Sequence, residues 1–418
     1  MTRPRPRTRV AARGATLVVL TLAPLRPARA MDAPAVPDAG VERPPEEDVR
    51  DAVEEPRWLG SHQERDGRFS AARWHRAARG EPLPEHVSAT LPGVGRPEHD
   101  AAVTSLAVLA FVGAGWTASG TTTEDRTVAW ARHFLRSEQR RDGAVGDPAG
   151  PAFATGHGLA TWALAALAAR SGRSDDAEAA ERAFVYAVTA RAEDERRWET
   201  DVGPGGVPPV AWLAMAADAA ATRGPDGPGP SLAWANAPAA MRVRRDVEAW
   251  LDEAPTSWSL GRVGVALALR LRGAPERRTE ATSAAAAAWI AARPPRWRED
   301  GVGVDVMGWA AGTWALFAVG GEPWRAWETT LRDAVVDRQR KDGTYCRLKG
   351  SWDPVGVWAD EGGRVFSTAA NALILEVWYR YDKVLGAAPE RPSRAVPAPQ
   401  PPPDGDRAPP PRRFAPCE

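Results

Sequence analysis

A short pattern that recurs along the chain constrains its fold more than any other feature. A Gln ends a helical stretch, an Asp-Gly pair follows, and an aromatic residue usually comes next. The copies are WLGSHQERDGRF (58–69), FLRSEQRRDGAV (134–145) and RQRKDGTY (338–345). Asp-Gly suits a tight turn, because Asp bonds downstream backbone groups and Gly adopts a positive φ without strain. The repetition of this turn predicts a helical-repeat architecture.

The helices expected around these turns are of two kinds. Residues 101–113 (AAVTSLAVLAFVG) and 158–169 (GLATWALAALAA) are apolar on nearly every side. A helix of this kind is buried all round. Residues 128–138 (VAWARHFLRSE) instead carry one apolar stripe and one charged face, which is typical of an outer helix. The two kinds alternate, so we expect each unit to contain one outer helix, one turn and one inner helix.

Six such units are expected, each an outer helix followed by an inner one. They pair 53–63 with 101–113, 128–139 with 155–169, 177–191 with 207–221, 243–253 with 261–271, 284–293 with 306–320, and 331–339 with 367–381. Trp198, Trp258 and Trp297 take the place of the aromatic residue in the third, fourth and fifth units. We therefore predict an all-α fold, an α/α toroid of about six hairpins with an inner and an outer layer. An open solenoid is the alternative, with a more polar concave face.

The ends of the chain differ from this repeat region. Five arginines precede the apolar run 15–25, and Ala28-Arg29-Ala30 follows, which is the layout of a secretory signal peptide at 1–30. Cleavage after Ala30 would give a secreted or periplasmic protein; a true start at Met31 is the alternative. We expect a disordered linker at 31–50, the toroid at 51–385 and a Pro-rich disordered tail at 386–418.

Charge and cysteine content bear on partners and cofactors. The chain has 54 Lys+Arg against 54 Asp+Glu, so we expect neither nucleic acid nor an anionic membrane as a partner. After the signal peptide we expect no membrane-spanning segment. Cys346 and Cys417 can pair after export, but the sequence leaves their pairing open. They lack a nearby His, so we expect no metal site and no cofactor. The expected partner is a small molecule or protein in the central cavity or on its rim.

The repeat region, 51–385, resembles the prenyltransferase and squalene–oxidosqualene cyclase repeat. The QW motifs of that family place a Gln, a Gly and an aromatic residue at a hairpin turn, as WLGSHQERDGRF and RQRKDGTY do here. Within that family, the chain most resembles uncharacterised secreted bacterial members. The resemblance includes the closing stretches GSWDP (350–354) and GGRVFST (362–368). The resemblance implies an α/α toroid.

The chemistry of that family does not carry over with the fold. Its triterpene cyclases protonate an alkene with an Asp-x-Asp-Asp acid, whereas Asp175-Asp176 lacks the leading Asp and 303–306 holds a single acid. Its protein prenyltransferases bind zinc through Asp, Cys and a later His. Asp342 and Cys346 have the wrong spacing for this, and no His follows His157. The Gly-Cys-Gly-Glu-Gln thioester of complement-like toroids is also absent.

Six residues near the predicted starts of inner helices are candidates for a site. A His between two glycines can serve as an acid or base, and two carboxylates across a cavity are what glycoside cleavage needs. An acid at a helix start is first of all an N-cap, and a His at this place is more often a capping or packing residue. The catalytic candidates are Asp100, His157 and Asp305, and the ligand-binding candidates are Asp353, Glu361 and Arg364.

Three functions remain open from the sequence, and whether the protein is an enzyme is undecided. The one we favour is a secreted, non-catalytic repeat protein that binds a ligand or another protein, because the catalytic motifs are missing. The second is an enzyme acting on isoprenoid-like substrates, as the resemblance and the 19 Trp would allow. The third is a carbohydrate-active α/α barrel, which the Trp-rich loops and the paired acids suggest.

Overall fold

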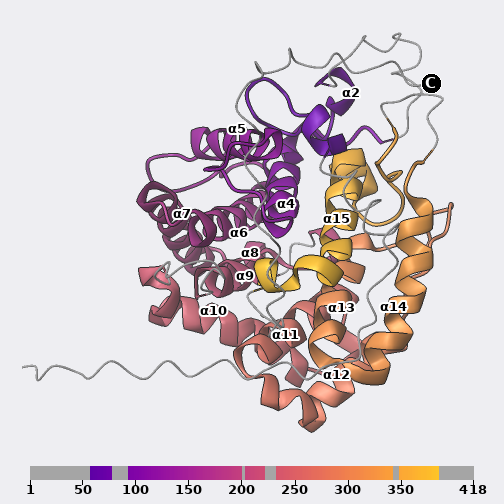
Figure 1. Ribbon diagram of the computed structural model, residues 1–418. Helices are drawn as coiled ribbons and strands as arrows, with labels where there is room; N and C mark the ends of the chain where they lie inside the picture. Colours follow the sequence, from indigo (N-terminus) through magenta and orange to yellow (C-terminus); the bar gives the residue numbers. More distant parts are fainter. Residues whose placement is uncertain (1–56, 78–92, 200–202, 222–231, 342–347, 386–418) are drawn as a thin grey trace, which may run out of the picture. The chain divides into compact units, whose positions relative to one another are not determined.

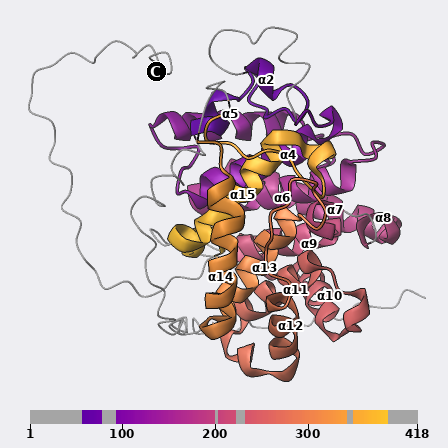
Figure 2. The same cartoon turned by 90° about the vertical axis from the view of Figure 1, so that its right-hand side faces the viewer.

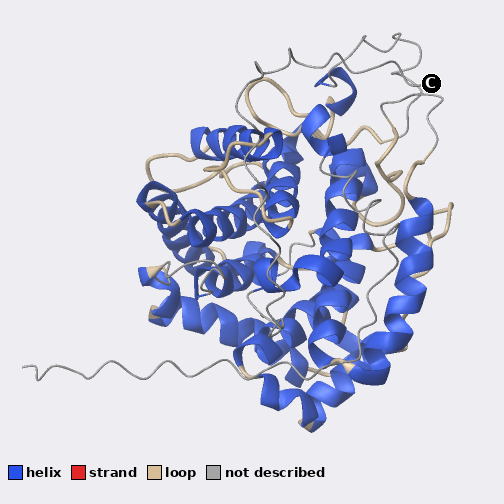
Figure 3. Ribbon diagram, in the orientation of Figure 1, coloured by secondary structure: helices blue, strands red, loops and turns tan. Residues whose placement is uncertain are grey.

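The computed structural model describes residues 57–77, 93–199, 203–221, 232–341 and 348–385, and these ranges are all-α. Figure 3 shows helices joined by loops. Every described element belongs to one compact unit of the chain. The predicted signal peptide, linker and Pro-rich tail lie outside the described residues, as do Cys346 and Cys417.

The described helices follow the predicted alternation. The inner helices are α4 (Asp100–Gly113), α6 (Phe153–Ser171), α9 (Pro209–Ala221), α11 (Leu260–Gly273), α13 (Val306–Val319) and α15 (Ala359–Leu385). The outer helices are α5 (Thr123–Ser137), α7 (Ser174–Glu193), α10 (Pro238–Glu248), α12 (Ala281–Ala291) and α14 (Gly321–Val335). Short pieces lie between them, notably α2 (Trp74–Ala77), α8 (Glu195–Glu199) and the 3₁₀ turns η2 (Pro204–Gly206), η6 (Pro275–Thr279) and η7 (Val336–Arg338).

Burial separates the two kinds of helix as the sequence predicts. In α6 every residue from Phe153 to Ala168 is buried. In α5 the buried apolar residues lie on one side, Val128, Ala131, Phe134 and Leu135, while Trp130 is 53% exposed. A capping box at Thr122 and Asp125 starts α5, since each side chain accepts a hydrogen bond from the backbone N–H of the other.

The packing of the inner helices forms a closed cycle. Each of α4, α6, α9, α11 and α13 packs against the next inner helix in the chain, and α15 packs against both α13 and α4. Figures 1 and 2 show α4 and α15 side by side although they lie far apart in the sequence. This cycle places the first and last described inner helices in direct contact.

The outer helices lie differently from the predicted pairing. We expected each outer helix to pair with the inner helix that follows it. Instead α5 packs mainly on α4, α7 on α6, α10 on α9 and α14 on α13, while α12 contacts both α11 and α13. Apart from α12, each outer helix therefore packs mainly on the inner helix that precedes it in the chain. The Asp-Gly turn is therefore the crossing from one hairpin to the next.

The bounds of the last outer and the last inner helix also differ from the prediction. The outer helix expected at 331–339 begins at Gly321, because Trp324 and Trp327 are spaced to lie on one helical face and both are buried. It ends at Val335, and η7 completes the segment. In α15, Gly363 has φ 62° and interrupts the helix. Among the described residues, every helix is too short or too polar to cross a lipid bilayer.

Candidate functional site

The Gln of the repeated pattern fastens one hairpin to the next. Nε2 of Gln63 donates a hydrogen bond to the carbonyl of Gly67 in its own turn and another to the carbonyl of Thr127 in α5, each at 2.9 Å. Nε2 of Gln139 makes the same pair, to Gly143 at 3.3 Å and to Ala179 in α7 at 2.9 Å. The side chain thus satisfies two carbonyls that belong to successive hairpins.

The glycine of the Asp-Gly pair completes this joint. Gly67 has φ 94°, and a Cβ there would lie 2.0 Å from the carbonyl oxygen of Trp130. Gly143 has φ 104°, and a Cβ there would lie 2.3 Å from the carbonyl oxygen of Arg182. Both oxygens belong to the next outer helix, one turn beyond the carbonyl that the Gln binds. Only Gly allows this approach.

A third contact ties each turn to its inner helix. The backbone N–H of Phe69 donates to Oγ1 of Thr104 at 3.0 Å. The N–H of Val145 donates to Nδ1 of His157 at 2.9 Å. The N–H of Trp352 donates to Oγ1 of Thr368 at 3.4 Å. Thr104, His157 and Thr368 therefore occupy the same position in three repeats.

In the sixth unit the Gln of the pattern contacts a glycine further along the chain than the Asp-Gly pair. Nε2 of Gln339 donates to the carbonyl of Gly350 at 3.2 Å, and Gly350 has φ 88°. The N–H of Arg340 donates to the carbonyl of Ser351 at 2.9 Å, and Trp352 fills the aromatic place. Gly350 therefore accepts the bond from the Gln at a positive φ, as Gly67 does in the first copy. The Asp342-Gly343 pair and Tyr345, to which the sequence assigned these roles, lie outside the described residues.

His157 is fully buried between α6 and α7. Because its Nδ1 accepts the Val145 N–H, Nε2 carries the ring proton and donates to the carbonyl of Ala183 at 2.9 Å. Burial lowers the pKa of His157 to about 4. The ring of Phe153 stacks on it with centroids 5.2 Å apart. The imidazole is neutral at pH 7, and both of its nitrogens are occupied by backbone groups.

Asp100 and Asp305 also have local partners. Asp100 is the first residue of α4, whose N-cap is His99, so our N-cap reading of Asp100 is wrong. Its carboxylate accepts from the N–H of Ala71 at 2.9 Å, and Nη1 of Arg68 lies 3.4 Å away. Asp305 does cap α13, accepting from the N–H of Gly308 at 2.9 Å. Burial raises the pKa of both carboxyl groups.

Two of the three ligand-binding candidates are brought together. Arg364 is fully buried, and its guanidinium donates to Asp353 at 2.5 Å and to Oγ of Ser351 at 2.9 Å. Burial acts to raise the pKa of Asp353, but its ion pairs with Arg364 and Arg340 outweigh burial and hold the pKa below its ordinary value. This carboxylate is therefore ionised and fully engaged.

The same cluster joins the last repeat to the first. The guanidinium of Arg364 lies 5.3 Å from the centroid of the Trp74 ring, and its backbone N–H donates to the carbonyl of Gly93 at 3.0 Å. Glu361 takes part through its backbone carbonyl, which accepts from the N–H of Arg96 at 2.8 Å. These contacts connect the segment before α4 with the start of α15.

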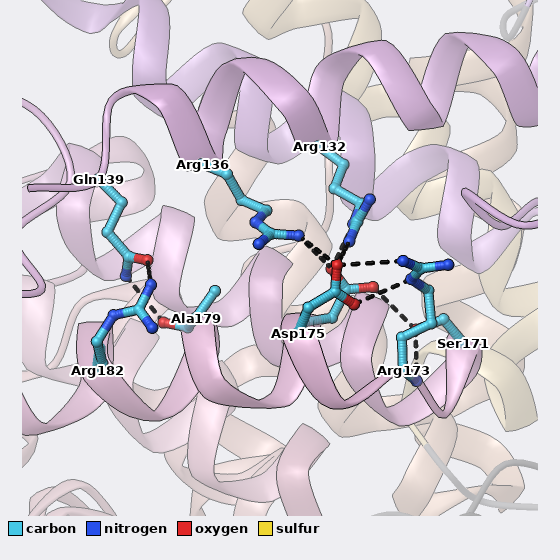
Figure 4. A network of polar contacts seen from close by, with 9 residues as sticks. Arg132, Arg136, Gln139, Ser171, Arg173, Asp175, Ala179 and Arg182 are labelled. Carbon is cyan, nitrogen blue, oxygen red and sulfur yellow. Dashed lines mark hydrogen bonds and ion pairs between the residues drawn. The ribbon is translucent and has the colours of Figure 1, made fainter.

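Sequence reasoning missed a network of arginines around Asp175 and Asp176. Figure 4 shows Arg132 and Arg136 reaching from α5 to Asp175 at the start of α7, with Arg173 on its other side. Nε of Arg132 also donates to Asp176, which is fully buried and accepts from Oγ of Ser171 at 3.0 Å. The spacing of two Arg one turn apart on an outer helix was the available signal.

The arginines around the Asp175-Asp176 pair determine whether it can act as a general acid. Hydrogen bonds from Arg173 and Arg136 hold the pKa of Asp175 well below its usual range. A carboxyl group held ionised in this way has no proton to give to a substrate. The pair is therefore a structural link between two outer helices, like the Gln139 contacts further along the same helices in Figure 4.

Aromatic side chains fill the space between three inner helices. Trp162 of α6 stacks on Trp212 of α9 with ring centroids 5.8 Å apart and planes at 4°. Trp314 of α13 meets Trp162 edge to face, also at 5.8 Å. Each of these three residues is less than 2% exposed. Since α6 and α13 are not consecutive inner helices, these rings occupy space where a central cavity was expected.

The described residues contain no group of three or more His, Cys, Asp or Glu side chains that could hold a metal ion. Comparisons with models of known protein families and with curated proteins find no match to this chain.

Proposed function

We propose that this chain is a secreted, non-catalytic helical-repeat module that binds a ligand or another protein. We propose further that its helices form an α/α toroid of the prenyltransferase and squalene–oxidosqualene cyclase type. The non-catalytic proposal rests mainly on the hydrogen bonds that the catalytic candidates make within the fold. Both ring nitrogens of His157 are bonded to backbone groups. Asp100 accepts the N–H of Ala71 and lies beside Arg68, and Asp305 accepts the N–H of Gly308 as the cap of its own helix.

Two further observations support the toroid. The inner helices pack in a closed cycle, from α4 round to α15 and back to α4. The joint built from a Gln, a positive-φ Gly and an inner-helix acceptor recurs in the first, second and sixth repeats. A repeat that buries the same joint at successive positions is the usual basis of such architectures.

The alternative functions lack comparable support. An enzyme for isoprenoid-like substrates needs an apolar cavity, and the indoles of Trp162, Trp212 and Trp314 pack against one another instead. Glycoside cleavage needs two carboxylates on either side of a substrate. Asp100 accepts the Ala71 N–H and Asp305 caps α13, so each is committed to its own loop or helix.

Product analysis tests the non-catalytic proposal. The full chain, without the signal peptide, is incubated with squalene and with prenyl diphosphates, and with a panel of oligosaccharides, and products are read by mass spectrometry. We expect no turnover above that of a heat-denatured sample. A product that disappears in Asp100→Asn, His157→Gln or Asp305→Asn, with the helical circular dichroism retained, would overturn the proposal. Binding is measured separately from turnover, as the retention of the same protein sample on immobilised glycans or immobilised proteins.

A further inference from the structure

Three exposed apolar side chains lie on loops that touch one another. The large apolar residues that are exposed in the described ranges are Val94, Trp130, Val185, Met241, Val302 and Val357. Val94 precedes α4, Val302 precedes α13 and Val357 precedes α15, and their exposed fractions are 47%, 64% and 45%. Each of these valines therefore belongs to the loop that enters an inner helix, whereas the other three residues lie on outer helices.

Direct contacts join the three loops. The backbone N–H of Val357 donates to the carbonyl of Val304 at 2.9 Å. At the other end of the same segment, a Cβ on Gly93 would lie 2.6 Å from Cγ of Pro354. The segment 354–357 therefore touches the loop before α13 at one end and the loop before α4 at the other. We refer to the three exposed valines and the loops that carry them as the valine rim.

The backbone of the valine rim is strained beside Val357. Trp358 has φ 68° and is the one non-glycine residue with a positive φ among the described residues. Its side chain is 8% exposed and contacts the rings of His99 and Phe366, with centroids 4.7 and 5.0 Å away. The turn thus buries Trp358 while Val357, directly before it, stays exposed. A bulky residue rarely adopts this conformation, and such strain is most common at functional sites.

The loop before α9, which contains η2, covers the starts of neighbouring inner helices beside this rim. A Cβ on Gly203 would lie 3.1 Å from the Thr155 side chain at the start of α6. A Cβ on Gly205 would lie 2.8 Å from the backbone N of Gly308 in α13, and a Cβ on Gly261 of α11 would overlap the carbonyl oxygen of Gly205. Backbone thus lies between these helix starts. Small molecules favour concave sites, so this surface suits a macromolecular partner better.

The charged residues around the three valines are of both signs. Those that are exposed and within six residues of a valine are Arg96, Glu98, Arg296, Arg298, Glu299, Asp300 and Asp360. Cations and anions are thus almost equal in number, and the rim has no dominant sign that would select an oppositely charged partner. A surface with both signs is complementary to a copy of itself, because a two-fold axis can bring the cations of one copy to the anions of the other.

We propose that the valine rim binds a second copy of this chain and forms a symmetric homodimer. Monomeric soluble proteins rarely expose contiguous apolar surface of this kind, and the core of a homodimer interface is more apolar than the rest of the surface. Dimers with a two-fold axis are also the commonest oligomers. The inference does not rest on the proposed function, since an enzyme and a binding module can dimerise equally well.

The test is the molar mass of the full chain, without the predicted signal peptide, measured by sedimentation velocity at a series of protein concentrations. Val302→Glu is the diagnostic variant, and Val185→Glu is its matched control, because Val185 is 55% exposed but lies on α7. We expect the wild type and Val185→Glu to dimerise. Val302→Glu should raise the dissociation constant by about tenfold or more, because it places a charge in an apolar interface.

Val357→Glu repeats the test at a second valine, and circular dichroism checks that each variant folds. A wild type that stays monomeric at every concentration would overturn the proposal. So would a dimer that both rim variants leave intact, or one that Val185→Glu weakens as much. Monomeric wild type that binds phosphatidylcholine vesicles, and loses this binding in Val302→Glu, would assign the rim to a lipid surface instead.

Discussion

The backbone N–H of Val145 donates a hydrogen bond to Nδ1 of His157, 2.9 Å away. Thr104 and Thr368 accept the equivalent N–H in the first and sixth repeats. The residue that looks most like a catalytic base in the sequence therefore does the work that a threonine hydroxyl does elsewhere in the same chain. Its chemistry is used to hold a turn against an inner helix.

The first prediction concerns the glycines of the Asp-Gly turns. Gly67→Ala and Gly143→Ala should each cost about 2 kcal/mol or more, because the new Cβ meets a carbonyl oxygen at 2.0 and 2.3 Å in addition to the strain of a positive φ. Gly146→Ala is the control, since Gly146 has φ 91° but no atom near its Cβ position. Urea unfolding gives the values, and equal losses at all three sites would contradict the joint.

The second prediction is a pH dependence set by His157. Its pKa is about 4 in the folded protein, against an ordinary value of 6.5, so the unfolded chain binds more protons between these values. Stability should therefore fall as the pH falls from about 6.5 to 4, by about 3 kcal/mol from this group. Below pH 4 both states are protonated and the loss is complete.

His157→Thr isolates that contribution, because it places the residue of the first and sixth repeats in the second. The variant will be less stable at neutral pH through lost packing against Phe153, but its stability should change less between pH 6.5 and 4 than that of the wild type. Denaturant unfolding at several pH values makes the comparison. Parallel curves for the two proteins would mean that His157 does not titrate in this way.

The third prediction concerns the arginine network between α5 and α7. Asp176→Asn should cost about 3 kcal/mol, since Asp176 is fully buried and its loss leaves Arg132 without its buried partner. Asp175→Asn should cost less, because the side chain of Asp175 is 37% exposed and water can replace the carboxylate. Thermal unfolding of both variants gives the ranking, and the reverse order would contradict this assignment.

The fourth prediction concerns the contact between the last and first repeats. Arg364→Met removes the ion pair with Asp353 and the bond to Ser351, and we expect the largest loss of hydrogen-exchange protection in α15 and α4. Arg364→Lys keeps the charge without the planar group and should give an intermediate loss. Uniform loss through α9 and α11 as well would show that the effect is not confined to this closure.

The sequence predicted the helical content and the alternation of helices well. Apolar residues occur at every angle of α6 and along one side of α5, and burial follows from that pattern. The contact of Gln339 with Gly350 was not predicted, because Gly350 lies eleven residues further along the chain. A local pattern of residue types does not record a partner at that separation.

The candidate site was predicted less well, for a related reason. That Asp353 and Arg364 lie near one another followed from their place before the predicted inner helix at 367–381. The partners that define what they do, Trp74 and the carbonyl of Gly93, come from the opposite end of the repeat region. The arginines around Asp175 likewise come from the preceding outer helix. These are tertiary contacts that no motif records.

The recurring joint is tested most directly by the free energy of unfolding of Thr104→Val. This change keeps the shape of the side chain but removes the hydroxyl that accepts the buried N–H of Phe69. We expect a loss of about 1–3 kcal/mol, the cost of an unpaired buried donor. Thr189→Val, at an exposed position of α7, is the control and should be nearly neutral. An equal and small effect at both sites would contradict the claim that this bond holds the turn to the inner helix.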